Sequence, residues 1–311
     1  MMFHSRRFWK SLKIALLAGL TLPAGYLPLA AEPEAPFTGQ GEVVSVVTWN
    51  IEWFPGRSPR ANESQQEAHR AEVAEYVPGL GADILLLQEI RDEEAAQFIV
   101  DQLPGLELNV VSRFVRPNPL ISQQVVIASR FPALAGFMEL FRGPGYDREE
   151  GDPYRGFAFA ALESPWGGTL LVYSVHLKSN RGDAGVNIPM RESAARQILA
   201  HIAEMTEEYA SRGEVQVIVG GDFNVILDRP EGGGEETIDL FLAEGFRSTW
   251  EGVPFADRVT WPARGRFGDA SFDYILTFNL PEVTASLIYK PQFELSDHRP
   301  VRIDLPLPAA D

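Results

Sequence analysis

Five short segments of the chain carry polar side chains of types that can bind a metal ion or move a proton. Each of them ends or interrupts an apolar run that is typical of a buried strand. Carboxylates and amides are the ligands that a hard cation prefers, and a histidine beside a carboxylate is suited to acid–base chemistry. The segments are Val46–Glu52, Asp83–Arg91, Val172–Asn180, Val217–Asn224 and the C-terminal pair Phe272–Leu276 with Ser296–Val301.

The first two segments present one candidate metal ligand each. Asn50 ends a β-branched run and could position a metal or a phosphate oxygen, although a turn-forming asparagine would fit the same place. Glu89 follows an apolar strand, where a carboxylate suits a cation such as Mg²⁺. An ion pair between Glu89 and Arg91 is the alternative.

The third segment places two cationic side chains near a strand end. His176 and Lys178 lie two residues apart, and the chain beyond residue 31 has only four histidines and two lysines. This arrangement is suited to holding phosphate oxygens. His69 and His201 lie in helix-like patterns, and we interpret both as structural.

The fourth and fifth segments contain candidates for proton transfer. Asp222 and Asn224 follow two glycines and could orient a water and a substrate oxygen together, whereas an Asx turn would explain only one of them. His298 directly follows Asp297 and could be a general acid or base, with Asp273 as the carboxylate that orients it.

Taken together and in this order, the segments resemble the endonuclease/exonuclease/phosphatase superfamily from about Val43 to Asp304. The Gly-Asp-Phe-Asn and Ser-Asp-His-x-Pro-Val sequences are its most specific motifs. The resemblance implies a deoxyribonuclease I-like, four-layer α/β sandwich, in which two packed mixed β-sheets are flanked by helices and the active site lies at one rim. It also implies hydrolysis of phosphoester bonds by in-line attack of water, with Mg²⁺ or Mn²⁺ as cofactor.

Matched position by position, the resemblance assigns roles to ten residues, and the spacing from His176 adds Lys178. They are Asn50, Glu89 and Asp297 for the metal, His176, Asp222, Asn224, Asp273 and His298 for catalysis, and Arg91, Arg155 and Lys178 for substrate binding. For the two arginines a surface salt bridge is the alternative. One departure concerns Gln123 and Gln124, which stand where the deoxyribonuclease-like pattern has a glutamate that supports a catalytic histidine.

These residues require an alternation of strands and helices to position them. Residues 42–308 show this alternation without an internal linker, which predicts one α/β domain. Predicted strands are Val43–Trp49, Ile84–Gln88, Val125–Ser129, Phe157–Leu162, Leu170–His176 and Val215–Val219. Predicted helices are Ser64–Val77, starting with a capping box at Ser64–Glu67, then Asp92–Leu103, Met190–Arg212 and Glu235–Glu244.

Residues 1–31 differ from the rest in composition. Four basic residues and no acidic one precede the apolar run Ile14–Leu22, and Leu29-Ala30-Ala31 has the small residues of a cleavage site. We expect a signal peptide over 1–31, a short linker over 32–41, and an exported protein that is periplasmic or secreted. A retained membrane anchor is the alternative, but Pro23, Gly25 and Pro28 interrupt the apolar stretch.

The composition limits the possible functions. The chain of 311 residues is 45% hydrophobic and lacks cysteine, which excludes disulfides and thiolate chemistry. The net charge of −16 becomes −20 without the four basic residues of the leader, so nucleic-acid binding by bulk electrostatics is disfavoured while a metal-dependent enzyme is not. We expect a monomer without stable membrane insertion after cleavage.

Three classes of function remain. The first is an endonuclease or exonuclease that acts on DNA or RNA. The second is the same chemistry on a sphingomyelin- or phosphoinositide-type lipid or a small phosphoester, which the negative charge favours, with Phe137–Phe141 as the candidate membrane contact. The third is a non-catalytic binding domain of the same fold.

Overall fold

The structure is a computed structural model that describes residues 43–115, 123–147, 155–225, 234–265, 267–283, 285–288 and 295–308. The predicted signal peptide and the predicted linker, residues 1–31 and 32–41, lie outside the described residues. The described residues all belong to one compact unit.

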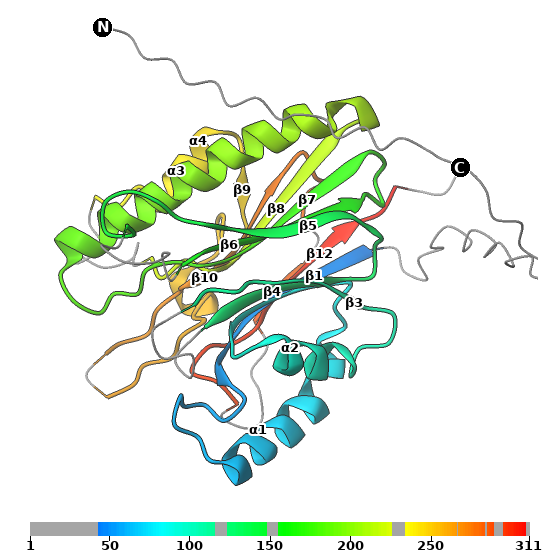
Figure 1. Cartoon of the computed structure of the whole chain (residues 1–311). Coiled ribbons are helices and arrows are strands. Elements are labelled where there is room, and N and C mark those ends of the chain that lie inside the picture. Colours follow the sequence, from blue (N-terminus) through cyan, green and yellow to red (C-terminus); the bar gives the residue numbers. More distant parts are fainter. Residues whose placement is uncertain are drawn as a thin grey trace, which may run out of the picture. The chain divides into compact units, whose positions relative to one another are not determined.

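Two six-stranded sheets pack face to face at the centre of this unit (Figure 1). In the first sheet the strand order is β11 (Ala285–Ile288), β12 (Val301–Pro306), β1 (Val43–Phe54), β2 (Ile84–Ile90), β4 (Gln124–Ser129) and β3 (Glu107–Val111). In the second sheet it is β5 (Ala133–Leu140), β6 (Gly156–Glu163), β7 (Thr169–His176), β8 (Val215–Asp222), β10 (Asp273–Phe278) and β9 (Arg247–Ser248).

Both sheets are mixed. The pairs β1–β2 and β7–β8 are parallel, and the other neighbouring strands are antiparallel. The central strands are buried on both faces, which is why they are continuous apolar runs in the sequence. In β1, for example, Val46 belongs to the core between the sheets and Val47 to the core beneath the helices of the first sheet.

Helices cover the outer face of each sheet (Figure 1). The helices α1 (Glu63–Tyr76) and α2 (Glu93–Val100) cover the first sheet, and α3 (Ala184–Tyr209) and α4 (Thr237–Ala243) cover the second. Short 3₁₀ turns occupy Val77–Leu80, Ala210–Arg212 and Phe255–Asp257. No helix among the described residues is both long and apolar enough to cross a membrane. The two packed sheets and the helices on their outer faces confirm the predicted four-layer α/β sandwich.

The caps of α1 and α3 differ from the prediction. The capping box of α1 consists of Asn62 and Gln65 rather than Ser64 and Glu67, because the Asn62 side chain accepts from the Gln65 amide and the Gln65 side chain from that of Asn62. Helix α3 begins at Ala184, six residues before the predicted start at Met190. Its N-cap is Asp183, whose side chain accepts from the amide of Gly185.

Strands β3, β5, β9, β10, β11 and β12 are absent from the sequence prediction. Most of them have no long apolar run, and β5 has a mixed burial pattern typical of an edge strand. Strand β12 alternates buried and half-buried residues because it has one face against the core.

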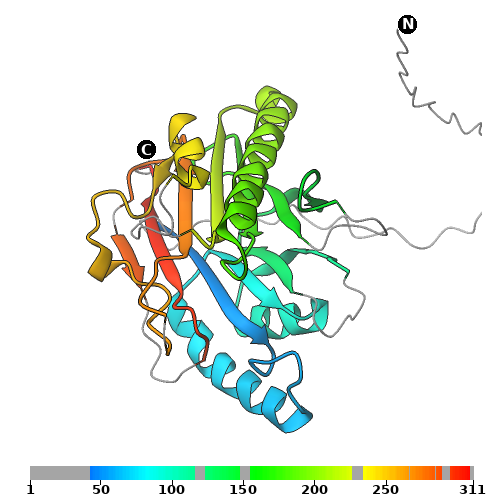
Figure 2. The ribbon, with the colours of Figure 1, turned by 90° about the vertical axis from the view of Figure 1, so that its left-hand side faces the viewer.

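The strand registers bring the polar segments to one edge of the two sheets. His176 on β7 lies opposite Asp222 on β8, and Asp273 on β10 lies opposite the same aspartate. In the first sheet the last residues of β1 lie beside those of β2, and the start of β12 pairs with Thr48 of β1. Figure 2 shows the red β12 beside the blue β1, which joins the two ends of the described chain.

One glycine permits the close approach of β7 and β8 next to this edge. Gly221 has φ +149°, and a Cβ atom there would collide with the carbonyl oxygen of Val175, its register partner. Gly221 is thus a steric requirement for placing Asp222 beside His176.

Candidate active site

Asp222 is at the centre of the polar cluster. Its Oδ2 lies 3.0 Å from Asn50 Nδ2, 3.4 Å from His176 Nε2 and 3.7 Å from His298 Nε2. Its Oδ1 accepts a hydrogen bond of 2.9 Å from the backbone amide of Asn224. All five residues are buried. Residues from both sheets therefore converge on one carboxylate.

His298 and Asp273 form a buried dyad. The imidazole Nδ1 lies 2.8 Å from Asp273 Oδ2, and the Asp273 amide donates to Thr260 Oγ1 at 3.2 Å. Burial lowers the pKa of His298, but the carboxylates of Asp273 and Asp222 outweigh it, so the pKa lies well above its ordinary value. The imidazole is consequently held as a cation that can donate from Nε2.

Ser296 connects this dyad to the first sheet. Its hydroxyl donates to the Asn50 carbonyl at 2.6 Å and accepts from the His298 amide at 3.0 Å. Sequence reasoning did not assign this serine, although a serine two residues before a histidine is the pattern of a local side-chain turn.

Glu89 lies on the opposite side of Asn50. Its Oε2 accepts from the Trp53 amide at 3.0 Å, and its Oε1 lies 3.5 Å from Asn50 Nδ2 and 3.8 Å from His176 Nε2. Burial raises the pKa of Glu89, and the nearby Asp297 carboxylate raises it further. The Glu89 and Asp297 carboxylates are thus close enough to repel each other.

Four residues at this site have a left-handed backbone that non-glycine residues rarely adopt. They are Glu52 (φ 30°), Trp53 (φ 55°), Glu89 (φ 61°) and Asn224 (φ 56°). The turn at Glu52 and Trp53 directs two successive amides toward Asn50 Oδ1 and Glu89 Oε2. Strain of this kind, about 1–3 kcal/mol per residue, is typical of functional sites.

The protonation of Asp222 is poised near neutrality. Burial raises its pKa to about 7, with His298 opposing the shift and Asp273 adding to it. A carboxylate with a pKa in this range can accept a proton from water more readily than an ordinary surface aspartate.

Asn50, Glu89 and Asp297 fit a hard divalent cation. Glu89 and Asp297 offer carboxylate oxygens, and Asn50 offers its Oδ1, which also accepts from the Glu52 amide while its Nδ2 faces Glu89 and Asp222. The raised pKa of the half-buried Glu89 is consistent with a negative charge that the protein compensates incompletely. A cation bound there would remove this electrostatic cost.

A second group of possible ligands is less suitable for a cation. Asp222, Asp273 and His298 bring one ligand atom each to within 4.8 Å of one another. However, His298 Nδ1 and Asp273 Oδ2 already share a hydrogen bond, and Asp222 Oδ2 accepts from Asn50. These hydrogen bonds favour an acid–base arrangement.

The three residues predicted to bind substrate lie at the margins of the cluster. Arg155 donates from Nη1 to the His176 carbonyl at 2.7 Å and from Nη2 to Gln123 Oε1 at 3.4 Å. Lys178 donates to the backbone carbonyls of Ser179 and Arg181 within its own loop.

Arg91 lies on the far side of Glu89, apart from the central cluster. Its Nε donates to Asp92 at 2.7 Å and its Nη1 to Gln66 at 2.8 Å. The predicted alternative of a Glu89–Arg91 ion pair is wrong, because Arg91 pairs with Asp92.

Gln123 and Gln124, which stand where the deoxyribonuclease-like pattern has a glutamate, form no hydrogen bond with a histidine among the described residues. Gln123 binds Arg155, and Gln124 binds Ser112 and the backbone of Phe114.

The two histidines interpreted as structural lie away from the cluster. The His69 Nδ1 accepts from the Gly56 amide, and its Nε2 lies 2.8 Å from the Leu295 carbonyl. His201 Nδ1 lies 2.9 Å from the buried Tyr173 hydroxyl.

Glu52 is a further polar residue at the rim that the sequence reasoning did not assign. It pairs with Arg57 at 2.8 Å and with Arg264 at 3.7 Å. Its position two residues after Asn50 was the available signal, since both lie at the end of β1.

Comparison with known proteins agrees with this architecture. A family model described as Endonuclease/Exonuclease/phosphatase family matches residues 47–298. No curated protein sequence matches the chain. Among solved structures, truncated TDP2 of Caenorhabditis elegans superposes with a TM-score of 0.63 and 21% identity, covering 85% of this chain and 97% of that chain.

Two further structures have the same fold. An endonuclease/exonuclease/phosphatase from Bacteroides vulgatus gives a TM-score of 0.63 at 17% identity, covering 86% of this chain and 99% of its own. The human nocturnin catalytic domain, whose structure contains a bound sulfate, gives 0.61 at 16% identity and covers 85% and 94%.

Proposed function

This chain belongs to the endonuclease/exonuclease/phosphatase family, and we propose that it is a divalent-metal-dependent phosphodiesterase that cleaves polynucleotides. The observation that carries the proposal is the convergence on Asp222 Oδ2 of Asn50, His176 and His298 within 3.0–3.7 Å. The Glu89 and Asp297 carboxylates lie next to this cluster, so a general base, two imidazoles and the proposed metal ligands are adjacent.

Asp222 is the proposed base. In its ionised form it takes one proton from the attacking water, whose oxygen then bonds to phosphorus while the bond to the leaving oxygen breaks. The Asn224 amide holds the carboxylate in place through Oδ1, so that Oδ2 remains directed toward the histidines.

The two histidines are the proposed donors to the phosphate. His298, held as a cation by Asp273, donates from Nε2 to an oxygen on which negative charge develops, and His176 donates from its own Nε2. The Arg155 bond to the His176 carbonyl fixes the backbone of that residue.

Glu89, Asp297 and Asn50 are the residues that would hold Mg²⁺ or Mn²⁺. The bound cation would neutralise charge on the phosphate and on the leaving oxygen. Hydrogen bonding of Glu89 to the Trp53 amide keeps its carboxylate in position for this purpose.

The polynucleotide substrate is supported by local charge. Although the chain carries a net charge of −16, cationic side chains flank the cluster on two sides. Besides burial, Arg155, Arg191 and Arg181 lower the pKa of Lys178, so these cations lie within electrostatic range of one another. Arg60 and Arg91 lie on the side of Glu89.

The lipid alternative has less support. In the segment considered for membrane contact, Phe141 is fully buried. Phe137 is 38% exposed and its ring packs 4.8 Å from that of Phe159, so the segment presents one exposed aromatic ring. A non-catalytic role would not explain why a strained backbone and a row of buried titratable groups are maintained at one point.

The proposal extends to location. We propose that residues 1–31 direct export, on the basis of their basic start, apolar run and small residues before Glu32. Mass spectrometry of the protein recovered outside the cytoplasm should give an N-terminus near Glu32, and an intact N-terminus would contradict it.

A substrate panel tests the activity. The purified protein and its His176→Ala variant are incubated with supercoiled plasmid, a labelled single strand, sphingomyelin liposomes and bis(p-nitrophenyl) phosphate, each in Mg²⁺, Mn²⁺ or EDTA. Cleavage of nucleic acid that requires both the metal and His176 supports the proposal. Hydrolysis of liposomes alone would overturn the polynucleotide substrate, and no hydrolysis by folded protein would overturn the phosphodiesterase.

A further inference from the structure

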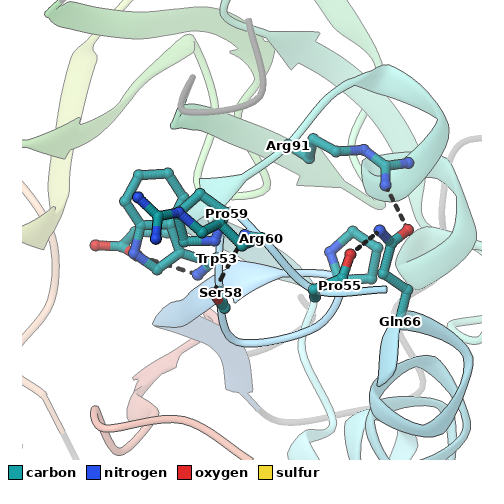
Figure 3. Close-up of a pocket in the computed structure, with 9 residues that line it drawn as sticks. Trp53, Pro55, Ser58, Pro59, Arg60, Gln66 and Arg91 are labelled. Atoms are coloured by element: carbon teal, nitrogen blue, oxygen red, sulfur yellow. Dashed lines mark hydrogen bonds between the residues drawn. The ribbon is translucent and has the colours of Figure 1, made fainter. Parts of the chain in front are cut away.

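A pocket of about 220 Å³ opens beside Glu89, and Asp222 is not among its lining residues. Figure 3 shows a close-up of this pocket. It is lined by Trp53, Pro55, Ser58, Pro59, Arg60, Ala61, Gln66, Glu89 and Arg91. Pockets that enclose a whole drug-sized ligand have about 300–1,000 Å³. This smaller pocket is suited to one ring system with an attached charged group.

Arg91 is held in place at one wall of this pocket. Figure 3 shows its guanidinium directed at Gln66, to which Nη1 donates at 2.8 Å. Gln66 is itself fixed by donating to the Ala61 carbonyl at 2.9 Å, and Asp92 holds Arg91 Nε. The Arg91 Nη2 group makes no hydrogen bond to a described residue. A pre-positioned guanidinium of this kind is suited to a phosphate group.

Arg60 supplies a second guanidinium to the same pocket. It is exposed, and among the described residues its side chain takes part in no ion pair or hydrogen bond. Its backbone amide is bound to Ser58 Oγ at 3.2 Å, which orders the turn from which the side chain extends. The charges of Arg60 and Arg91 are balanced by Glu89 and by Asp92, so the pocket offers a phosphate guanidinium donors rather than an excess of positive charge.

The remaining walls are apolar and stiff. Trp53 is half-buried and lies on the left-handed turn whose amide binds Glu89, so the indole is anchored next to the proposed metal site. Pro55 and Pro59 line the pocket beside it. An aromatic face of this kind binds nucleobases without regard to their sequence.

We propose that this pocket binds the nucleotide adjacent to the scissile phosphate, with its phosphate at Arg91 and Arg60 and its ring against Trp53. The proposal rests on the proposed function, because Glu89 is what connects the pocket to the reacting phosphate. This phosphate contact makes the enzyme selective for substrates that have a second phosphate, and therefore for polynucleotides over small phosphodiesters.

Dinucleotides with one internal phosphodiester isolate this contact. The rate constant kcat/KM is measured for thymidylyl-thymidine without a terminal phosphate, with a 5′ phosphate and with a 3′ phosphate, in Mg²⁺ or Mn²⁺. The wild type is compared with Arg91→Gln and Arg60→Gln. Arg113→Gln is the matched control, since Arg113 is an exposed arginine that pairs with Glu93 outside the pocket.

One of the two phosphorylated dinucleotides should be cleaved with a kcat/KM at least roughly tenfold above that of the unphosphorylated one, as expected for a charge-assisted hydrogen bond. This advantage should fall toward one in Arg91→Gln and Arg60→Gln and persist in Arg113→Gln. Arg60→Gln keeps the test valid if loss of the Gln66 and Asp92 contacts destabilises the Arg91 variant.

Two results would overturn the inference. If the wild type cleaves all three dinucleotides equally, or if both pocket variants keep the advantage, the pocket does not bind the neighbouring phosphate, while the proposed function stands. If the folded wild type cleaves none of them and also leaves bis(p-nitrophenyl) phosphate and longer strands intact, the proposed function fails and the inference fails with it.

Discussion

His298 Nδ1 lies 2.8 Å from Asp273 Oδ2 in a position where both side chains are buried. Asp273 is located there by its register with Asp222, and His298 by the serine turn that precedes it. The carboxylate therefore fixes both the orientation of the imidazole and its charge, and it leaves Nε2 facing Asp222.

Replacing this carboxylate by an amide should impair catalysis without unfolding the protein. In Asp273→Asn the pKa of His298 falls and the imidazole loses its fixed orientation, so kcat should drop by roughly 10²- to 10⁴-fold. Steady-state hydrolysis of a labelled strand measures it. Asp101→Asn, at an exposed position paired with Gln97, should behave as wild type. Equal rates for the two variants would contradict the assigned role.

Removing the charge of Glu89 should weaken metal binding. Glu89→Gln keeps the size and the hydrogen bond from Trp53 but loses the ionic ligand, so affinity for Mn²⁺ should fall by at least about tenfold. Isothermal titration calorimetry measures the affinity directly. The rise in melting temperature that the wild type shows on adding Mn²⁺ should be smaller in the variant. An unchanged affinity would move the metal site away from Glu89.

His69 should make stability depend on pH. Burial lowers its pKa to about 4 in the folded chain, whereas the ordinary value is 6.5. Between these values the unfolded chain binds more protons, so this residue's contribution to the free energy of unfolding is complete above pH 6.5 and is lost as the pH falls toward 4. The loss amounts to about 3 kcal/mol.

Comparison with a non-titrating side chain isolates this contribution. His69→Gln can still accept from the Gly56 amide and donate to the Leu295 carbonyl. Urea unfolding between pH 4 and 7.5 should show the wild type losing stability relative to the variant as the pH is lowered. Parallel curves would mean that His69 does not remain neutral in the folded chain.

A buried ion pair on the far side of β7 should stabilise the fold. Arg191 donates from Nε and Nη2 to the two carboxylate oxygens of Glu235 at 2.6 and 2.7 Å, and from Nη1 to the Lys178 carbonyl. Glu235→Gln leaves the guanidinium without its counter-ion, which should cost about 3–5 kcal/mol in urea unfolding.

A double variant separates the pair from its surroundings. Arg191→Met with Glu235→Leu removes both charges and should recover much of the lost stability, because apolar groups of similar size often replace a buried ion pair without loss. A cost below about 1 kcal/mol for the single variant would show that the pair is dispensable.

The central strands could be predicted from the sequence because burial on both faces makes them continuous apolar runs. Strand β7, for instance, was predicted to within one residue. The edge strands β3, β5, β9 and β11 could not, because they lack such runs. The inner strands β10 and β12 were missed because polar residues interrupt their apolar residues. The helix caps were misplaced where an alternative cap was available, as with Asn62 in place of Ser64.

The chemical types in the site were evident in the sequence, and their contacts were not. Asp222 could be singled out by its place after an apolar strand, and His298 by the adjacent Asp297 and the proline that follows. The hydrogen bonds that link Asn50 to Asp222 and to Ser296 could not, because they connect residues far apart in the chain. The pocket beside Glu89 also depends on the left-handed turn at Trp53, which no residue pattern indicates.

The most direct test of the account is the rate of bis(p-nitrophenyl) phosphate hydrolysis by wild type and Asp222→Asn, each with Mg²⁺, with Mn²⁺ and with EDTA. The substrate has one phosphodiester and needs no contact beyond the central cluster. The account predicts turnover by the wild type with metal, none in EDTA, and a loss of at least roughly 100-fold in Asp222→Asn at unchanged melting temperature. Turnover that persists in EDTA or in the variant would contradict it.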